Sequence, residues 1–222
     1  MNYVDFMSPL HRSTQRDYLA RVNDPDYPKS KAAALAKKFD FDYWDGDRKI
    51  CYGGYKYIPN RWDDVIKKMI SYYDLDSNAR ILDIGCGKGF MMYDFINLMP
   101  KAEVRGIDIS EYAIDNCKPE IKNYITQGSA THLPWPDNYF DLVISINTLH
   151  CLYSYDLQSA LKEMERVGKR KYLCVESYRN EVEKANLLYW QVTCEAFNTP
   201  KEWLWWFDQT QFTGDYSFIY FE

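Results

Sequence analysis

An apolar strand that runs directly into three alternating glycines constrains this chain more than any other feature. Residues 81–90 read Ile-Leu-Asp-Ile-Gly-Cys-Gly-Lys-Gly-Phe, and a helical pattern follows them. Glycines at 85, 87 and 89 let the backbone turn tightly and approach a ligand closely. Their spacing differs from the glycine patterns that cradle phosphate groups, and Asp83 would repel a pyrophosphate. We therefore expect a site for a cofactor that carries a cationic amine.

Later segments repeat the order of a strand followed by small or polar residues. A second expected strand ends in Asp108, about 20 residues after the glycines, where a carboxylate meets ribose hydroxyls in dinucleotide sites. Ser129 and Ala130 follow the third expected strand, and Asn147 follows the fourth. In parallel sheets, ligands bind at the carboxyl ends of the strands. We expect these residues to face one ligand.

In this order the segments resemble the motifs of class I S-adenosylmethionine (SAM)-dependent methyltransferases. Residues 81–90 resemble motif I, 104–110 the strand that ends in the ribose-binding acid, 127–135 the adenine-binding segment and 140–145 the fourth strand. The resemblance covers roughly residues 65–178, and it departs from the family at Ser129, where an acid is usual. It implies SAM as cofactor and S-adenosylhomocysteine (SAH) as product. The implied cofactor-binding residues are Asp83, Gly85, Cys86, Gly87, Asp108, Ile109, Ser129, Ala130 and Asn147.

The alternation of strands and helices predicts an α/β, Rossmann-like class I methyltransferase sheet with helices on both faces. We expect one structural domain, with an N-terminal cap or lid segment at 1–61 and a SAM-binding methyltransferase domain at 62–222. The family usually has seven strands, of which six can be identified. The expected strands are 80–84, 103–108, 122–126, 140–146, 171–176 and 216–221. The expected helices lie near 29–39, 61–73, 88–98, 110–116, 155–167 and 181–198.

Residues 39–62 hold too many aromatic side chains for a solvated linker. One interpretation is a satellite hydrophobic cluster beneath a long loop, and the other is a lid that carries binding groups. The lid interpretation makes Tyr52, Tyr55, Tyr57 and Arg61 candidates for binding the substrate or the SAM carboxylate. Both interpretations can hold together.

Methyl transfer is a direct displacement, so the protein must position the acceptor and take up a proton where necessary. His150 follows the fourth strand, and its ordinary pKa suits proton acceptance near neutrality, although a packing or helix-start role is the alternative. Glu176 and Tyr178 follow the fifth strand and are further candidates, Glu176 as a catalytic residue and Tyr178 as a substrate-binding one.

The formal net charge of −5 for 222 residues argues against a nucleic-acid partner,. Residues 1–61 are the basic part, with eleven Lys or Arg against eight Asp, which favours a small anionic substrate. No apolar run is long enough to span a membrane, and residues 1–10 lack a signal-peptide pattern, so we expect a cytoplasmic protein without a membrane partner. The six cysteines form no C-x-x-C pair, and no metal site is expected.

The predicted reaction is methyl transfer to O or N of a small polar, anionic metabolite. The aromatic segment also resembles, more weakly, methyltransferases of surface-polysaccharide biosynthesis, which suggests such a precursor. Two alternatives remain: a catalytically silent SAM-binding or interaction protein, and a nucleic-acid or protein methyltransferase. The sequence after the fourth strand, 145–149, lacks the N-P-P-[YF] pattern expected of the latter. Three tryptophans near the C-terminus suggest either a substrate pocket or a homodimer interface, and we expect at least one of them to pack in the core. They are Trp203, Trp205 and Trp206.

Overall fold

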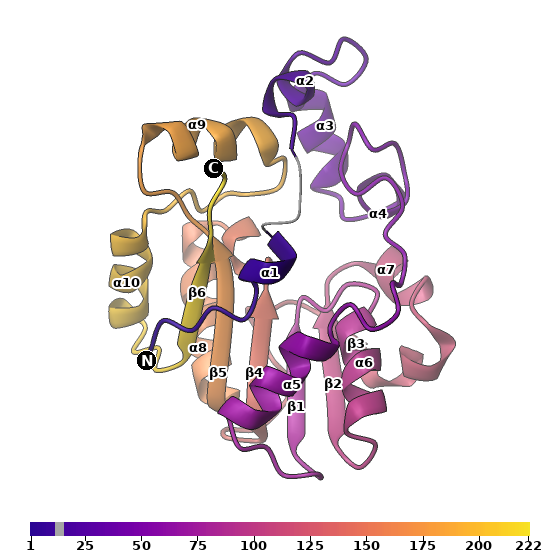
Figure 1. The fold of residues 1–222 in the computed structure, drawn as a ribbon, viewed down its shortest axis with the longest axis vertical. Coiled ribbons are helices and arrows are strands. Elements are labelled where there is room, and N and C mark those ends of the chain that lie inside the picture. Colours follow the sequence, from indigo (N-terminus) through magenta and orange to yellow (C-terminus); the bar gives the residue numbers. More distant parts are fainter. Residues whose placement is uncertain (12–15) are drawn as a thin grey trace.

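A six-stranded sheet forms the centre of the computed structural model, which describes residues 1–11 and 16–222 (Figure 1). The strand order is β3-β2-β1-β4-β5-β6, and every neighbouring pair is parallel. The order reverses between β1 and β4, and such a switch point opens a crevice at the carboxyl ends of the strands. The strands are β1 (Arg80–Ile84), β2 (Glu103–Asp108), β3 (Ile125–Gln127), β4 (Phe140–Ile146), β5 (Gly168–Glu176) and β6 (Asp215–Ile219).

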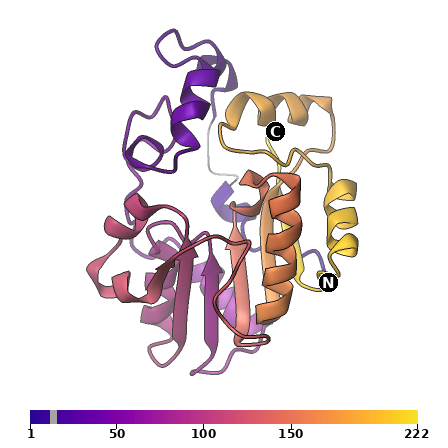
Figure 2. The ribbon, with the colours of Figure 1, turned by 180° about the vertical axis from the view of Figure 1, so that it is seen from behind.

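Helices cover both faces of the sheet, as Figures 1 and 2 show from opposite sides. The helices of the first face are α5 (Asp63–Tyr72) and α6 (Phe90–Leu98), and those of the second are α8 (Ser154–Val167) and α10 (Pro200–Gln209). Alternate strand residues point to opposite faces, so Leu142 and Ile144 pack towards α5 and α6, and Val143 packs towards α8 and α10. The shorter helices are α7 (Glu111–Asp115) and the 3-10 turns η1 (Pro119–Tyr124) and η2 (Leu149–Cys151).

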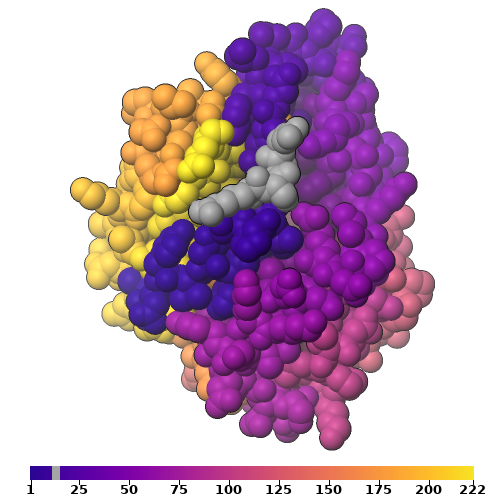
Figure 3. Space-filling model, in the orientation of Figure 1, coloured from indigo at the N-terminus to yellow at the C-terminus, as the bar shows by residue number. Residues whose placement is uncertain are grey.

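The first 61 residues divide into two parts. Residues 1–11, which include α1 (Ser8–His11), pack on the sheet: the Val4 amide donates to the Tyr216 carbonyl at 2.9 Å, and Phe6 and Met7 are buried. Figure 3 shows these residues beside the C-terminal segment. Residues 16–61, which we call the cap, lie beyond the carboxyl ends of the strands (Figure 1). The cap contains α2 (Tyr18–Val22), α3 (Lys29–Ala36) and α4 (Phe41–Trp44), and α9 (Glu181–Trp190) lies at the same end.

The expected parallel α/β sheet and its six strands are confirmed, with corrections at the boundaries. The third strand begins at Ile125 instead of residue 122, because Pro119 starts a 3-10 turn that continues to Tyr124. Helix α9 ends at Trp190 instead of residue 198, because the backbone leaves the helical conformation at the extended Gln191. The aromatic segment near the C-terminus is a helix with a Thr199–Glu202 capping box,. Trp203 on this helix is fully buried, as core packing requires.

Candidate active site

The glycine loop after β1 is shaped by two close contacts. Gly85 has φ +75°, and a Cβ there would lie 2.1 Å from Thr148 Oγ1. Gly87 has φ +54°, and a Cβ there would lie 2.6 Å from the Trp44 ring. Both positions therefore require glycine, for their backbone conformation and for the space they leave.

A small cavity lies at the ends of β1, β2 and β3, and it has a volume of about 120 Å³. The Asp108 carboxylate stands in it and accepts hydrogen bonds from the amides of Gly87 (2.7 Å) and Ser110 (2.8 Å). Burial raises the pKa of Asp108, against these hydrogen bonds. We call this space the cofactor cavity. Of the predicted cofactor residues, Gly85, Asp108, Ile109, Ser129, Ala130 and Asn147 line it.

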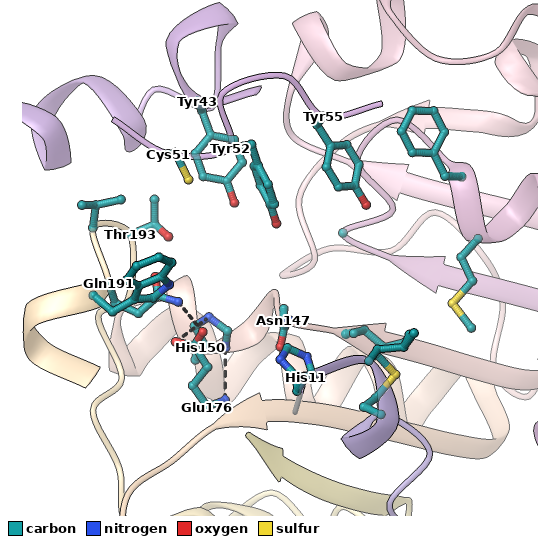
Figure 4. Close-up of a pocket in the computed structure, with 18 of the residues that line it drawn as sticks. His11, Tyr43, Cys51, Tyr52, Tyr55, Asn147, His150, Glu176, Gln191 and Thr193 are labelled. Carbon is teal, nitrogen blue, oxygen red and sulfur yellow. Dashed lines mark hydrogen bonds and ion pairs between the residues drawn. The ribbon is translucent and has the colours of Figure 1, made fainter. Parts of the chain in front are cut away.

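A larger cavity of about 290 Å³ lies between the cap and the ends of β1, β4 and β5. We call it the acceptor cavity. The hydroxyls of Tyr43, Tyr52 and Tyr55 point into it from the cap, opposite His150 and the other groups from the sheet (Figure 4). Burial raises the pKa of Tyr55 to about 12, so its hydroxyl stays protonated and is able to donate a hydrogen bond. The cavity also receives Asp83, Cys86, Asn147 and Glu176.

His150 and Glu176 form a buried pair on the floor of the acceptor cavity. His150 Nδ1 accepts from the Glu176 amide at 3.4 Å, and His150 Nε2 lies 3.4 Å from Glu176 Oε2. Gln191 donates to Glu176 Oε1, whereas Oε2 lacks a hydrogen-bond partner among the described residues. Burial lowers the pKa of His150 to about 3 and raises that of Glu176 to about 8. At neutral pH the imidazole is therefore neutral, and Glu176 is mostly a protonated acid that ionises in mildly basic solution.

Asp83 is the second buried acid of the acceptor cavity. Burial, together with the nearby Asp108 carboxylate, raises the pKa of Asp83 to about 7. A cationic amine beside Asp83 would stabilise the ionised form. The two carboxylates therefore suit a ligand with hydroxyls at Asp108 and an ammonium group at Asp83, and this donor set fits SAM.

Polar contacts hold the cap on the glycine loop and on the start of α7. Lys88 Nζ lies 2.6 Å from Asp45 Oδ2, and the Tyr112 hydroxyl donates to the same oxygen at 2.9 Å. Trp44 Nε1 donates to Ser110 Oγ at 2.9 Å. The lysine of the glycine loop therefore serves the cap and has no free charge for a phosphate. The hydrophobic cluster predicted for this segment is present, with Tyr43, Trp44 and Ile50 among its buried members, and the lid role stays a prediction.

The structure brings most of the predicted substrate residues to the site, but not all. Tyr52, Tyr55 and Arg61 line the acceptor cavity. Tyr57 instead donates to Asp94 Oδ1 at 2.5 Å, and Tyr178 is buried in the core; neither lines the two cavities. Gly87 lies beneath Trp44 and lines neither cavity. Seven further residues line the acceptor cavity without a local sequence pattern that marks them: His11, Arg16, Arg21, Tyr43, Trp190, Gln191 and Thr193.

Two absences concern the described part of the chain. Among residues 1–11 and 16–222, no group of His, Cys, Asp or Glu side chains is arranged to hold a metal ion. Within the same ranges, no helix has the length and apolar character to cross a membrane.

Comparison with known proteins identifies the family. A family model described as a methyltransferase domain matches residues 75–211, more than half of the chain. An uncharacterized methyltransferase of Schizosaccharomyces pombe is 33% identical over 43% of this chain and 38% of its own length. A malonyl-(acyl-carrier protein) O-methyltransferase of Geobacter sulfurreducens is 33% identical over 40% and 34%. The demethylmenaquinone methyltransferase of Symbiobacterium thermophilum is 26% identical over 69% and 62%. The chain thus matches less than two thirds of the length of each of these relatives.

Solved structures show the same fold. YcgJ of Bacillus subtilis superposes with a TM-score of 0.52 at 22% identity, over 66% of this chain and 67% of that protein. A Bacillus halodurans C-125 protein gives 0.53 at 19% identity, over 65% and 67%. The family model covers more than half of the chain, so the chain belongs to the methyltransferase-domain family, and its fold is that of the class I SAM-dependent methyltransferases.

Proposed function

We propose that the chain transfers the SAM methyl group to an oxygen or nitrogen atom of a small, polar, anionic metabolite. One observation carries the proposal: the cofactor cavity and the acceptor cavity meet at Tyr43, Gly85 and Asn147. Asp108 stands in the first cavity and Asp83 in the second, so a cofactor that contacts both acids reaches the acceptor cavity. SAM supplies an electrophilic methyl group there, and the protein holds the acceptor beside it.

The charge of the acceptor cavity favours an anionic acceptor. Arg16, Arg21, Arg48 and Arg61 line the cavity. Burial raises the pKa of Glu176 to about 8, so this acid is mostly protonated near neutral pH. The other acid of the cavity, Asp83, would be paired with the ammonium group of the cofactor, which leaves little unpaired negative charge. The named relatives act on unlike acceptors, a malonyl-carrier protein and demethylmenaquinone, so their names favour no particular acceptor for this chain. A surface-polysaccharide precursor stays a prediction from the sequence.

We further propose that Glu176 is the proton acceptor and that His150 positions it. A general base works best when its pKa lies near the working pH. The pKa of about 8 for Glu176 meets this condition better than the value of about 3 for His150. Glu176 Oε2 is buried and lacks a hydrogen-bond partner among the described residues, which leaves it free to accept a proton from the acceptor.

Radiolabelled SAM tests the proposed function. We expect label to pass from the methyl group to a component of a small-metabolite extract, and not to RNA, DNA or protein. SAH should also raise the melting temperature, because a ligand at 100 times its dissociation constant stabilises the folded state by about 2.7 kcal/mol. SAH binding without a labelled product in any pool would support the silent SAM-binding alternative. Label in RNA, DNA or protein would support the alternative of a nucleic-acid or protein methyltransferase.

The pKa of Asp83 predicts how SAH binding depends on pH. Ionised Asp83 is the form that attracts the SAH ammonium group, and it is lost as the pH falls through about 7. We therefore expect SAH to bind about tenfold more weakly at pH 6 than at pH 8, since each pH unit below the pKa lowers the ionised fraction nearly tenfold. Calorimetric titrations at the two pH values measure this ratio.

The matched control is Asp83→Asn, which keeps the shape of the side chain and cannot ionise. Its affinity for SAH should be weaker and nearly equal at the two pH values. Asp108 also has a raised pKa and would remain in this variant. An unchanged tenfold ratio in Asp83→Asn would therefore transfer the effect to another group.

A further inference from the structure

Three arginines of the cap region surround one indole ring in the acceptor cavity. The guanidinium carbons of Arg16, Arg21 and Arg48 lie 5.7, 5.1 and 5.6 Å from the centre of the Trp190 ring. The arginines come from the first part of the chain, whereas Trp190 ends α9, and all four residues line the cavity. We call this set the arginine cluster.

The positive charges of the cluster are only weakly compensated by acids: Arg16 acts on Glu176 from a distance and opposes the burial that raises the pKa of that carboxyl. Within the described residues, no ion pair joins these arginines to an acid. Arg21 donates to the Ile50 carbonyl at 2.6 Å, and Arg48 donates to the Cys51 carbonyl. These neutral acceptors orient the guanidinium groups without cancelling their charge. The buried Nε atoms of Arg16 and Arg21 have no hydrogen-bond partner in the part of the chain that the structure describes.

Such an arrangement is unfavourable without a counter-ion. Arg16 and Arg21 are partly buried, and a charge removed from water is stabilised when it is paired and hydrogen-bonded. Like charges that converge on one ring also repel each other, and this includes the exposed Arg48. Cation–π attraction to the indole offsets part of this cost, but it adds no negative charge. The lower pKa of Arg21, caused by burial and also by the neighbouring Arg48, is the expected result of missing compensation. An anion in the cavity would supply it.

We propose that the arginine cluster is a subsite for an oxyanion of the methyl acceptor, either a carboxylate or a phosphate. The guanidinium fork matches both groups in two-bond geometry, and the indole gives an apolar face beside them. Gln191 follows Trp190 and donates to Glu176. The subsite therefore adjoins the group proposed as base, and an acceptor anchored by its anion presents its nucleophile near Glu176. This inference rests on the proposed function and specifies which residues hold the acceptor.

Small anions test the subsite without knowledge of the acceptor. The probes are inorganic phosphate and malonate, titrated at constant ionic strength against chloride with SAH present, and followed by melting temperature. We expect a saturable rise in the wild-type protein. Arg21→Gln and Arg48→Gln should each weaken the apparent affinity by about tenfold, because a hydrogen bond to a charged group contributes about that factor or more. The stronger of the two probes identifies the class of oxyanion.

Arg170→Gln is the matched control, since Arg170 is exposed and lies near the amino end of β5, away from the cavity. It should respond like the wild type. Arg48 is also exposed, so its replacement leaves the core intact even if Arg21→Gln fails to fold. A wild-type protein without a saturable response, or equal responses in Arg48→Gln and Arg170→Gln, would overturn the subsite. If the anion test fails but SAH still raises the melting temperature, the subsite is wrong and the proposed function stands. If SAH has no effect either, the subsite and the proposed function are both wrong.

Fractionated extract extends the test to the acceptor. Anion-exchange chromatography should place the methyl-accepting activity in retained fractions. If phosphatase treatment abolishes that activity, the anchor is a phosphate; if the activity survives phosphatase and is lost after carboxyl amidation, the anchor is a carboxylate. Arg48→Gln should raise KM for the retained acceptor about tenfold with kcat nearly unchanged, because the contact is made equally in the bound and transition states. Acceptor activity in the unretained fraction would contradict the subsite.

Discussion

Replacement of Glu176 by glutamine is expected to lower kcat by about 10²- to 10⁴-fold, the range that a positioned general base contributes. The amide keeps the size of the side chain and its contact with Gln191 but cannot accept a proton. SAH affinity should change by less than about twofold, because Glu176 lines the acceptor cavity and not the cofactor cavity. Methyl transfer to the acceptor fraction at saturating SAM measures the rate, and calorimetry with SAH measures the affinity.

The pH profile distinguishes a base from a packing residue. The pKa of Glu176 in the free protein is about 8 because of burial, so the reactive carboxylate forms as the pH rises through that value. The rate at low acceptor concentration should increase about tenfold per pH unit below pH 8 and level off above it. Glu176→Gln should lose this dependence, and His150→Asn should keep it with a lower rate. A Glu176→Gln enzyme that keeps the wild-type profile would show that another group, or none, takes the proton.

Local chain geometry explains why the cofactor half of the site was predictable from sequence. Glycine spacing, the acid after β2 and the small residues after β3 all concern segments that follow strand ends directly. In a parallel sheet these ends meet at one edge. Asp108 and Ser129 therefore reach the cofactor cavity by topology alone, as Asn147 also does. Asp83 needs only its place within β1 to lie beside them.

The acceptor half depends on contacts between distant segments, which no local pattern encodes. Arg21 and Trp190 meet only because the cap and α9 lie at the same end of the sheet. Tyr57 does not reach the cavities because its hydroxyl donates to Asp94, a contact between distant segments that the local sequence does not indicate. The basic character of residues 1–61 was a usable signal. It indicated that basic residues of this segment gather near the site, without indicating which arginines converge.

Replacement of Gly85 by alanine is expected to weaken SAH binding by at least about 100-fold. The residue has φ +75°, which costs of order 1–3 kcal/mol for a side chain other than glycine. Its new Cβ would also lie 2.1 Å from Thr148 Oγ1 and 2.3 Å from Thr148 Cγ2. Gly85 and Thr148 both line the cofactor cavity, so the displacement that relieves this overlap deforms the place where the two cavities meet. Calorimetry with SAH measures the loss.

Gly54→Ala separates the overlap from the backbone strain. Gly54 has φ +107° in the cap, and a Cβ there would come no closer than 3.9 Å to the Lys56 side chain. This variant therefore carries the conformational cost without a collision, and we expect it to lower the melting temperature while SAH affinity stays within about threefold. Circular dichroism establishes that Gly85→Ala is folded before the titration. A folded Gly85→Ala protein with wild-type affinity would mean that the loop after β1 does not hold the cofactor where the two acids place it, because the overlap with Thr148 cannot be relieved without moving that loop.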